Sequence, residues 1–164
     1  MAISLRRVFV SLIAMLTFAM IVTYAITCFD KSELKVSQKI DVHEQNRIEQ
    51  ELKKLERNKK NNPNEVFAVD FKELVHFEWD KMYIFGPYAD GKDVNNKLGF
   101  HWTSETFINP SDEAHTIIFL KNNKIINYVE YWSFFKLNKE IFFPNDSKFE
   151  AEIDTNWVYW KPAK

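Results

Sequence analysis

Hydrophobic and polar positions divide the chain into three stretches. Val8–Thr27 contains no charged side chain, residues 29–65 are polar and dense in charge, and residues 66–164 alternate short apolar runs with turn signals. Short strands separated by turns, with short helical segments among them, indicate an α+β domain with a mainly antiparallel sheet and a short helix. The sequence therefore predicts an N-terminal segment 1–28, a linking segment 29–65 and one small domain at 66–164.

The N-terminal segment has the length and composition of a membrane anchor. Val8–Thr27 is 20 residues long, and a helix of that length spans about 30 Å, the thickness of a bilayer core. Arg6 and Arg7 precede it, and basic residues flanking a membrane segment favour the cytoplasmic side. We expect a single-pass transmembrane signal anchor at residues 1–28 in the cell membrane, with the N-terminus cytoplasmic and the C-terminal domain extracytoplasmic.

Cys28 gives this anchor an alternative reading. It is the only cysteine of the chain, so a disulfide within the chain and a zinc site built on several cysteines are both excluded. Ala25-Ile26-Thr27-Cys28 resembles a bacterial lipobox, with Thr27 where the motif has glycine, alanine or serine. The resemblance implies a lipoprotein lipidated at Cys28, from which residues 1–27 are removed. The length of the apolar run favours the retained helix.

The linking segment shows one weak amphipathic pattern. Ile48, Leu52 and Leu55 follow the spacing i, i+4, i+7, and Asn61-Asn62-Pro63 ends the pattern. Opposite charges stand four residues apart in two pairs, Glu49 with Lys53 and Glu56 with Lys60. The pattern predicts a helix of about 15–25 residues. Three apolar residues are too few for a coiled coil, so we expect a polar helical stalk, exposed to solvent, at residues 29–65.

The densest aromatic run of the domain, Phe77–Tyr88, predicts an inner strand. Trp79, Tyr83 and Phe85 share one side at period two, and Met82 and Ile84 occupy the other. Apolar residues on both sides suit a strand that is buried on both faces. Gly86-Pro87 ends it, since proline has no N–H for the sheet. Before this run we expect a short strand at Val66–Asp70 and a turn of helix at Phe71–Phe77.

Two further local structures follow along the chain. Asp90 or Asp93 can cap a helix that ends at Gly99, with Val94 and Leu98 on one face. Thr116–Trp132 predicts a β-hairpin with Asn122-Asn123 as a type I′ turn, because asparagine tolerates positive φ. A two-residue turn sets Phe119 opposite Ile126 and His115 opposite Glu130, a pair that would raise the pKa of the histidine.

The C-terminal strands supply the candidate binding surface. Phe149, Ala151 and Ile153 alternate with three acidic residues, and Trp157–Trp160 predicts a final short strand. We expect an acidic surface with exposed aromatics that binds a partner, formed by Glu150, Glu152, Asp154, Trp157 and Trp160, with Tyr159 beside them. The alternative is that the acids are the solvated side of a half-buried strand.

Charge narrows the function classes. Residues 61–164 carry 11 basic and 16 acidic side chains, and the last arginine is Arg57, which argues against nucleic-acid binding. No nucleophile stands with a base in a catalytic pattern, so we expect no catalytic residue, no metal and no cofactor. A metal-dependent enzyme built on His76, Glu78, Asp80 or His101 is the competing hypothesis, since such side chains ligate divalent ions.

Residues 66–135 also carry a family resemblance. Trp79-Asp80-Lys81-Met82-Tyr83-Ile84-Phe85-Gly86-Pro87-Tyr88 resembles the W-D-x-x-Y-x-F-G-P-Y core of small uncharacterised bacterial cell-envelope proteins with one membrane anchor. The order of a helix ending Leu98-Gly99 and then a hairpin resembles, in topology, the α+β domain of the outer-membrane assembly lipoprotein and β-lactamase-inhibitor type. These likenesses imply a bacterial envelope protein and transfer no catalytic residue.

The sequence thus predicts a membrane-anchored, non-enzymatic interaction protein that binds a protein or envelope component outside the cytoplasm. An inhibitor or immunity-type protein at the cell surface is the alternative, and the sequence does not separate the two. Neither hypothesis names the partner.

Overall fold

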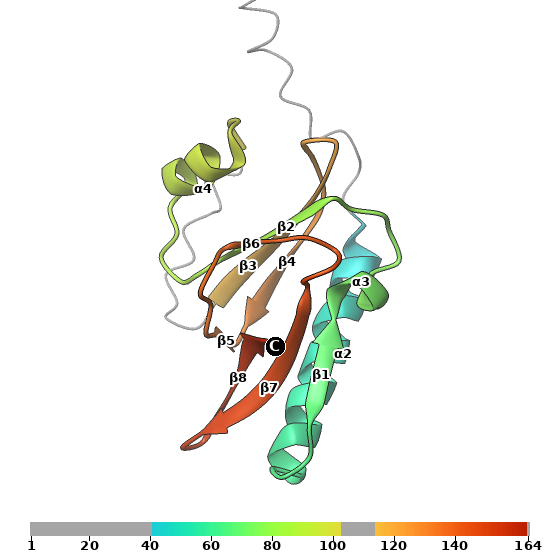
Figure 1. Cartoon of the computed structure of the whole chain (residues 1–164). Coiled ribbons are helices and arrows are strands. Elements are labelled where there is room, and N and C mark those ends of the chain that lie inside the picture. Colours follow the sequence, from blue (N-terminus) through green and yellow to red (C-terminus); the bar gives the residue numbers. More distant parts are fainter. Residues whose placement is uncertain (1–40, 103–113, 164) are drawn as a thin grey trace, which may run out of the picture. The chain divides into compact units, whose positions relative to one another are not determined.

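The computed structural model describes residues 41–102 and 114–163. The predicted anchor Val8–Thr27 and Cys28 lie outside these residues. Among the residues that are described, no helix is both long and apolar enough to cross a membrane. The elements, in chain order, are α2 (Val42–Asn61), β1 (Phe67–Asp70), α3 (Phe71–Leu74), β2 (Lys81–Phe85), α4 (Gly91–Leu98), β3 (Ala114–Lys121), β4 (Lys124–Trp132), β5 (Phe134–Phe135), β6 (Ile141–Phe142), β7 (Lys148–Asp154) and β8 (Trp157–Pro162) (Figure 1).

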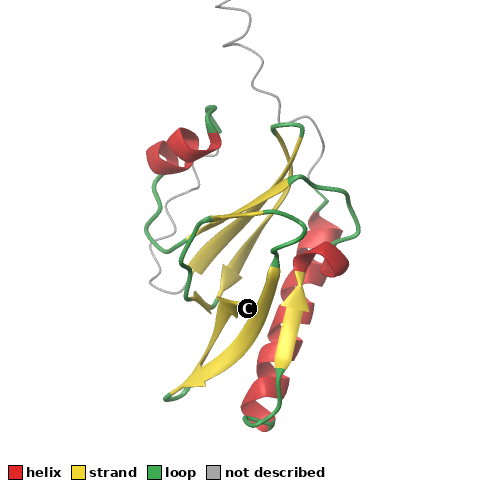
Figure 2. Cartoon of the chain, viewed as in Figure 1, coloured by secondary structure: helices red, strands yellow, loops and turns green. Residues whose placement is uncertain are grey.

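The strands form two four-stranded sheets (Figure 2). The C-terminal sheet has the order β1-β7-β8-β5, and the hairpin sheet has the order β4-β3-β2-β6. All pairings are antiparallel except that of β5 with β8, which is parallel. The predicted α+β class with a mainly antiparallel arrangement and a short helix is confirmed.

Helix α2 begins at the N-cap Asp41 and has 20 residues, within the predicted length. Ile48 and Leu52 are fully buried in a cluster that we name the main core, which also contains Phe149 and Trp160 of the C-terminal sheet and Met82 and Phe119 of the hairpin sheet. The expected solvated stalk is therefore wrong for this segment: its apolar stripe is narrow, but it is wide enough to cover strands. The Glu49–Lys53 ion pair forms. Glu56 instead turns toward the sheets, where it accepts hydrogen bonds from Ser133 and from Trp160 Nε1 at 3.1 Å.

Strand β2 is an inner strand, as predicted, because it lies between β3 and β6. Met82 and Ile84 face the main core, which α2 also enters, while Tyr83 and Phe85 face a second cluster with Val94 and Leu98 of α4. Trp79 precedes the strand and joins the main core, so its predicted place beside Tyr83 and Phe85 is wrong. Both faces of the hairpin sheet are thus covered by apolar side chains.

The short helices and the hairpin turn have the predicted chemistry. Asp90 is the N-cap of α4, its side chain accepting from Asp93 N–H, and Gly99 ends the helix at a φ of 78°. Asn122 and Asn123 have φ values of 52° and 57°, as a type I′ turn requires.

The predicted register of the hairpin holds only next to its turn. Lys121 faces Lys124, but the register shifts between Phe119 and Leu120, so Phe119 faces Asn127 instead of Ile126. A β-bulge, which places one extra residue on one strand, is the physical reason. It sets Glu130 opposite Thr116, and the predicted pairing of His115 with Glu130 is wrong: His115 faces Tyr131.

Candidate functional site

The C-terminal sheet presents one face to the main core and one to solvent. Phe149, Ala151, Val158 and Trp160 point inward and pack in the core. The opposite side, which we name the outer face, carries the alternate residues of β7, β8 and β5 and the lysine that directly follows β5: Glu150, Glu152, Asp154, Trp157, Tyr159, Lys161, Phe134 and Lys136. Five of the residues named from the sequence therefore share one side of one sheet: Glu150, Glu152, Asp154, Trp157 and Tyr159.

Trp160 does not belong to this surface. Its side chain is fully buried, because residues two apart on a strand share a side and Trp160 shares one with Val158. The prediction that Trp160 is an exposed binding residue is therefore wrong. Trp157 is 54% exposed and makes an edge-on contact with Phe134, with ring centroids 5.5 Å apart.

Two of the three acids of the outer face, Glu152 and Asp154, form ion pairs with lysines. Glu152 forms an ion pair with Lys161 and accepts from the Tyr159 hydroxyl at 2.5 Å. The hydrogen bond from Lys161, and then that from Tyr159, hold the pKa of Glu152 below its ordinary value. Asp154 lies 3.3 Å from Lys136 Nζ, and that ammonium stands 3.7 Å from the Tyr159 ring centre. Two of the three predicted acids are therefore neutralised by lysines, and Glu150 lies outside these two ion pairs.

The four candidate metal ligands have other partners and do not converge. Glu78 pairs with Lys121, and the Asp80 carboxylate accepts from Asn122 N–H at 2.6 Å. His76 Nδ1 lies 3.6 Å from Glu44, and His101 Nδ1 lies 2.8 Å from Asn95 Nδ2. Within residues 41–102 and 114–163 no three histidine, cysteine or acidic side chains gather in a way that would hold a metal ion.

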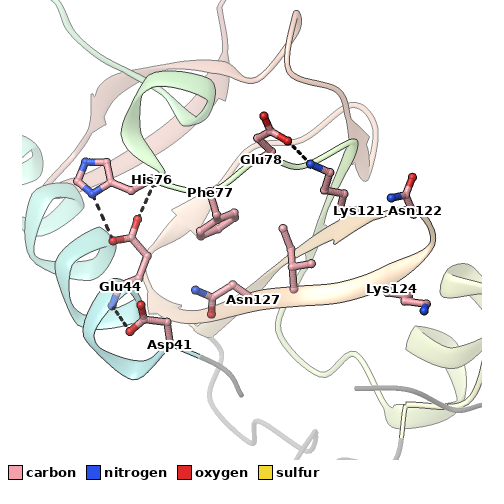
Figure 3. Close-up of a pocket in the computed structure, with 10 residues that line it drawn as sticks. Asp41, Glu44, His76, Phe77, Glu78, Lys121, Asn122, Lys124 and Asn127 are labelled. Atoms are coloured by element: carbon pink, nitrogen blue, oxygen red, sulfur yellow. Dashed lines mark hydrogen bonds and ion pairs between the residues drawn. The ribbon is translucent and has the colours of Figure 1, made fainter. Parts of the chain in front are cut away.

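A pocket of about 780 Å³ opens between the start of α2, the segment 76–78 and the β3–β4 hairpin (Figure 3). Its lining residues are Asp41, Glu44, His76, Phe77, Glu78, Lys121, Asn122, Lys124, Ile126 and Asn127. Among these described residues none is a serine, threonine or cysteine nucleophile. The pocket has the size of a small-molecule site and offers charges and apolar contacts.

Glu44 is the most constrained side chain of this pocket. It accepts from Arg47 Nε at 2.8 Å and from His76 N–H at 2.8 Å, and the first of these contacts is the main reason that its pKa lies below the ordinary value. Asp41 accepts from the N–H groups of His43 and Glu44 as the N-cap of α2. Both carboxylates are therefore held in place before any ligand arrives.

Sequence reasoning missed the lysines that neutralise the outer face and all of the pocket. Lys136 lies two residues after Phe134, and Lys161 lies two residues after Tyr159. This spacing places each lysine on the same side as the aromatic residue, so the sequence could have predicted both lysines on the outer face. Asp41 and Glu44 have the Asp-x-x-Glu spacing of a helix N-terminus, which marks the cap but not the pocket beside it. The segment 76–78 reaches the pocket only through the tertiary fold.

Neither a protein-family model, nor a curated protein, nor a solved structure matches this chain. The resemblance to anchored envelope proteins stays a prediction from the residues that carry it.

Proposed function

We propose that this protein is a non-enzymatic, single-pass membrane-anchored protein whose extracytoplasmic domain binds a protein or envelope component on its outer face. The anchor part of the proposal is supported by the 20 uncharged residues Val8–Thr27. The binding part is supported by one observation, the exposure of Trp157 at the edge of a face on which two of the three acids are already paired.

The paired charges decide which residues of the face contribute affinity. Tryptophan is enriched among the residues that carry most of the binding energy at interfaces, because its large ring loses much water-exposed area on binding. Ion pairs that remain at the rim of an interface add little. Trp157 and Phe134 therefore anchor the partner, and Glu152 with Lys161 orients it.

The test is capture of the partner by the full chain in membranes solubilised with a non-ionic detergent. We compare the wild type with Trp157→Ala and with the control Phe143→Ala, whose side chain is 44% exposed in the loop after β6. One stoichiometric partner, lost in Trp157→Ala and kept in Phe143→Ala, is the expected result. Equal capture by all three proteins would remove the outer face from the proposal.

The identity of the captured molecule separates the alternatives. A single hydrolase, inhibited in proportion to the bound chain, would indicate the inhibitor or immunity-type function. A structural envelope component would indicate an interaction protein. The intact mass of the purified chain decides the anchor: the full sequence mass supports the retained helix, whereas loss of residues 1–27 with an added lipid supports lipidation at Cys28.

A further inference from the structure

The pocket in Figure 3 carries charges of opposite sign at its two ends. Asp41 and Glu44 stand where α2 begins, and Lys121 and Lys124 stand on the two strands of the hairpin. Figure 3 shows Phe77 between the two ends, and Ile126 lies two residues after Lys124 on β4. Both side chains are partly buried and pack against the main core. The pocket therefore joins an acidic end, an apolar middle and a basic end.

One charged side chain at each end of the pocket lies outside the ion pairs of the described residues. Glu44 is neutralised by Arg47, and Lys121 by Glu78. Within the described part of the chain, Asp41 has hydrogen bonds from backbone N–H groups but no cationic partner, and Lys124 has no acidic partner. The full charge of Asp41 exceeds the partial positive charge of a helix N-terminus, which is about half a unit.

The position of Lys124 in the hairpin is electrostatically unfavourable. It stands directly opposite Lys121 in the hairpin, and like charges facing each other across two strands are destabilising. The pair of Lys121 with Glu78 already offsets part of this repulsion, and an anionic group bound beside Lys124 would offset more of it. The basic end of the pocket thus offers a ligand carboxylate the attraction of a partly exposed ammonium group.

Asn127 adds an amide group to the wall of the pocket. Its side chain is 1% exposed yet lines the pocket, and Figure 3 shows it projecting from β4 into the space toward the start of α2. Its oxygen accepts from Tyr128 N–H at 2.9 Å, while its amide nitrogen donates no hydrogen bond to any described residue. An amide group donates through its nitrogen, so a carbonyl oxygen of a ligand in the pocket can accept a hydrogen bond from Asn127.

We propose that this pocket binds a short zwitterionic peptide, with its ammonium group at Asp41, its carboxylate at Lys124, a backbone carbonyl on Asn127 and an apolar side chain between Phe77 and Ile126. The site is separate from the outer face and does not depend on the proposed function. Its walls are fixed by the cap, the Glu44 contacts and the bond from Asn122 N–H to Asp80, so little ordering is needed on binding.

The test uses four forms of the tripeptide Gly-Leu-Gly: both ends free, N-acetylated, C-amidated, and blocked at both ends. Calorimetric titration of the full chain in non-ionic detergent at neutral pH and low salt measures each affinity. We expect the free tripeptide to bind about two- to fivefold more tightly than either singly blocked form, as expected for partly exposed charge contacts. Equal affinities for all four forms, or no binding of the free form at millimolar concentration, would overturn the proposal.

Two variants locate the site. Asp41→Asn keeps a good N-cap but removes the negative charge. It should therefore abolish only the preference for a free amine and leave the preference for a free carboxylate. Lys124→Gln should erase the preference for a free carboxylate alone. Lys92→Gln, at an exposed position of α4, is the control and should keep both preferences. If both preferences survive in Asp41→Asn and Lys124→Gln, the peptide binds elsewhere and the assignment of this pocket is wrong.

Discussion

The two sheets differ in the number of faces that they bury. The hairpin sheet has apolar side chains on both faces, with Ile117 and Phe119 in the main core and Ile118 and Leu120 in the cluster beside α4. The C-terminal sheet buries only the side of Phe149 and Trp160, and pairs charges on the other. The described domain thus completes its core and leaves one sheet face outside it, and this is the face on which we propose that a partner binds.

The largest difference in stability is expected between variants of Trp157 and Trp160, because these residues lie on the same strand but on opposite sides of the sheet. Trp160→Ala should lower the free energy of unfolding by about 3–5 kcal/mol, since it leaves a large cavity and removes a donor to Glu56. Trp157→Ala should change it by no more than about 0.5 kcal/mol. Urea unfolding followed by circular dichroism gives both values. Equal losses would mean that the two sides of β8 are not distinct.

Helix α2 supports the buried side of the C-terminal sheet. Leu52→Ala should cost about 2–5 kcal/mol, as for other fully buried leucines, whereas Leu55→Ala, at a partly buried position, should cost less. The same unfolding experiment ranks them. A neutral Leu52→Ala would restore the solvated stalk that the sequence suggested, and a chain starting at residue 62 would then fold.

The contribution of the buried acid Glu44 to stability can be measured through its dependence on pH. Its pKa is lowered in the folded chain, chiefly by the hydrogen bond from Arg47. Its contribution to the free energy of unfolding is therefore fully present above its ordinary pKa near 4.5. This contribution is lost as the pH falls through the lower pKa of the folded chain. Glu44→Gln should cost about 1–3 kcal/mol at neutral pH, because Arg47 and His76 N–H lose a charged acceptor. The difference from wild type should shrink in acid. A constant difference from pH 7 to strong acid would contradict this role.

Glu152 gives the smallest expected effect. It lies on the outer face, where water screens its pair with Lys161. Glu152→Gln should leave the free energy of unfolding unchanged within error. Added salt should not alter the difference in this free energy between the variant and the wild type. A clear loss of stability would mean that the charges of the outer face hold the sheet together and are not available to orient a partner.

The sequence predicted the parts of the fold that depend on neighbouring residues. The cap at Asp90, the φ values of Asn122 and Asn123 and the two-sided burial of β2 all follow from local chemistry or short periodicity. The role of α2, the bulge beside Phe119 and the side of Trp160 depend on which elements meet in space. The pocket depends on three segments that meet only in the folded chain, so its residues carry no joint signal in the sequence.

The most direct test of the outer face as a binding surface is site-specific photo-crosslinking in the producing cell. A photoreactive phenylalanine derivative replaces Trp157 in one full-length chain and Phe143 in another, and adducts are compared after irradiation. The account predicts one discrete adduct from position 157 and none of that mass from position 143. The same adduct from both positions, or an adduct from position 143 alone, would contradict it.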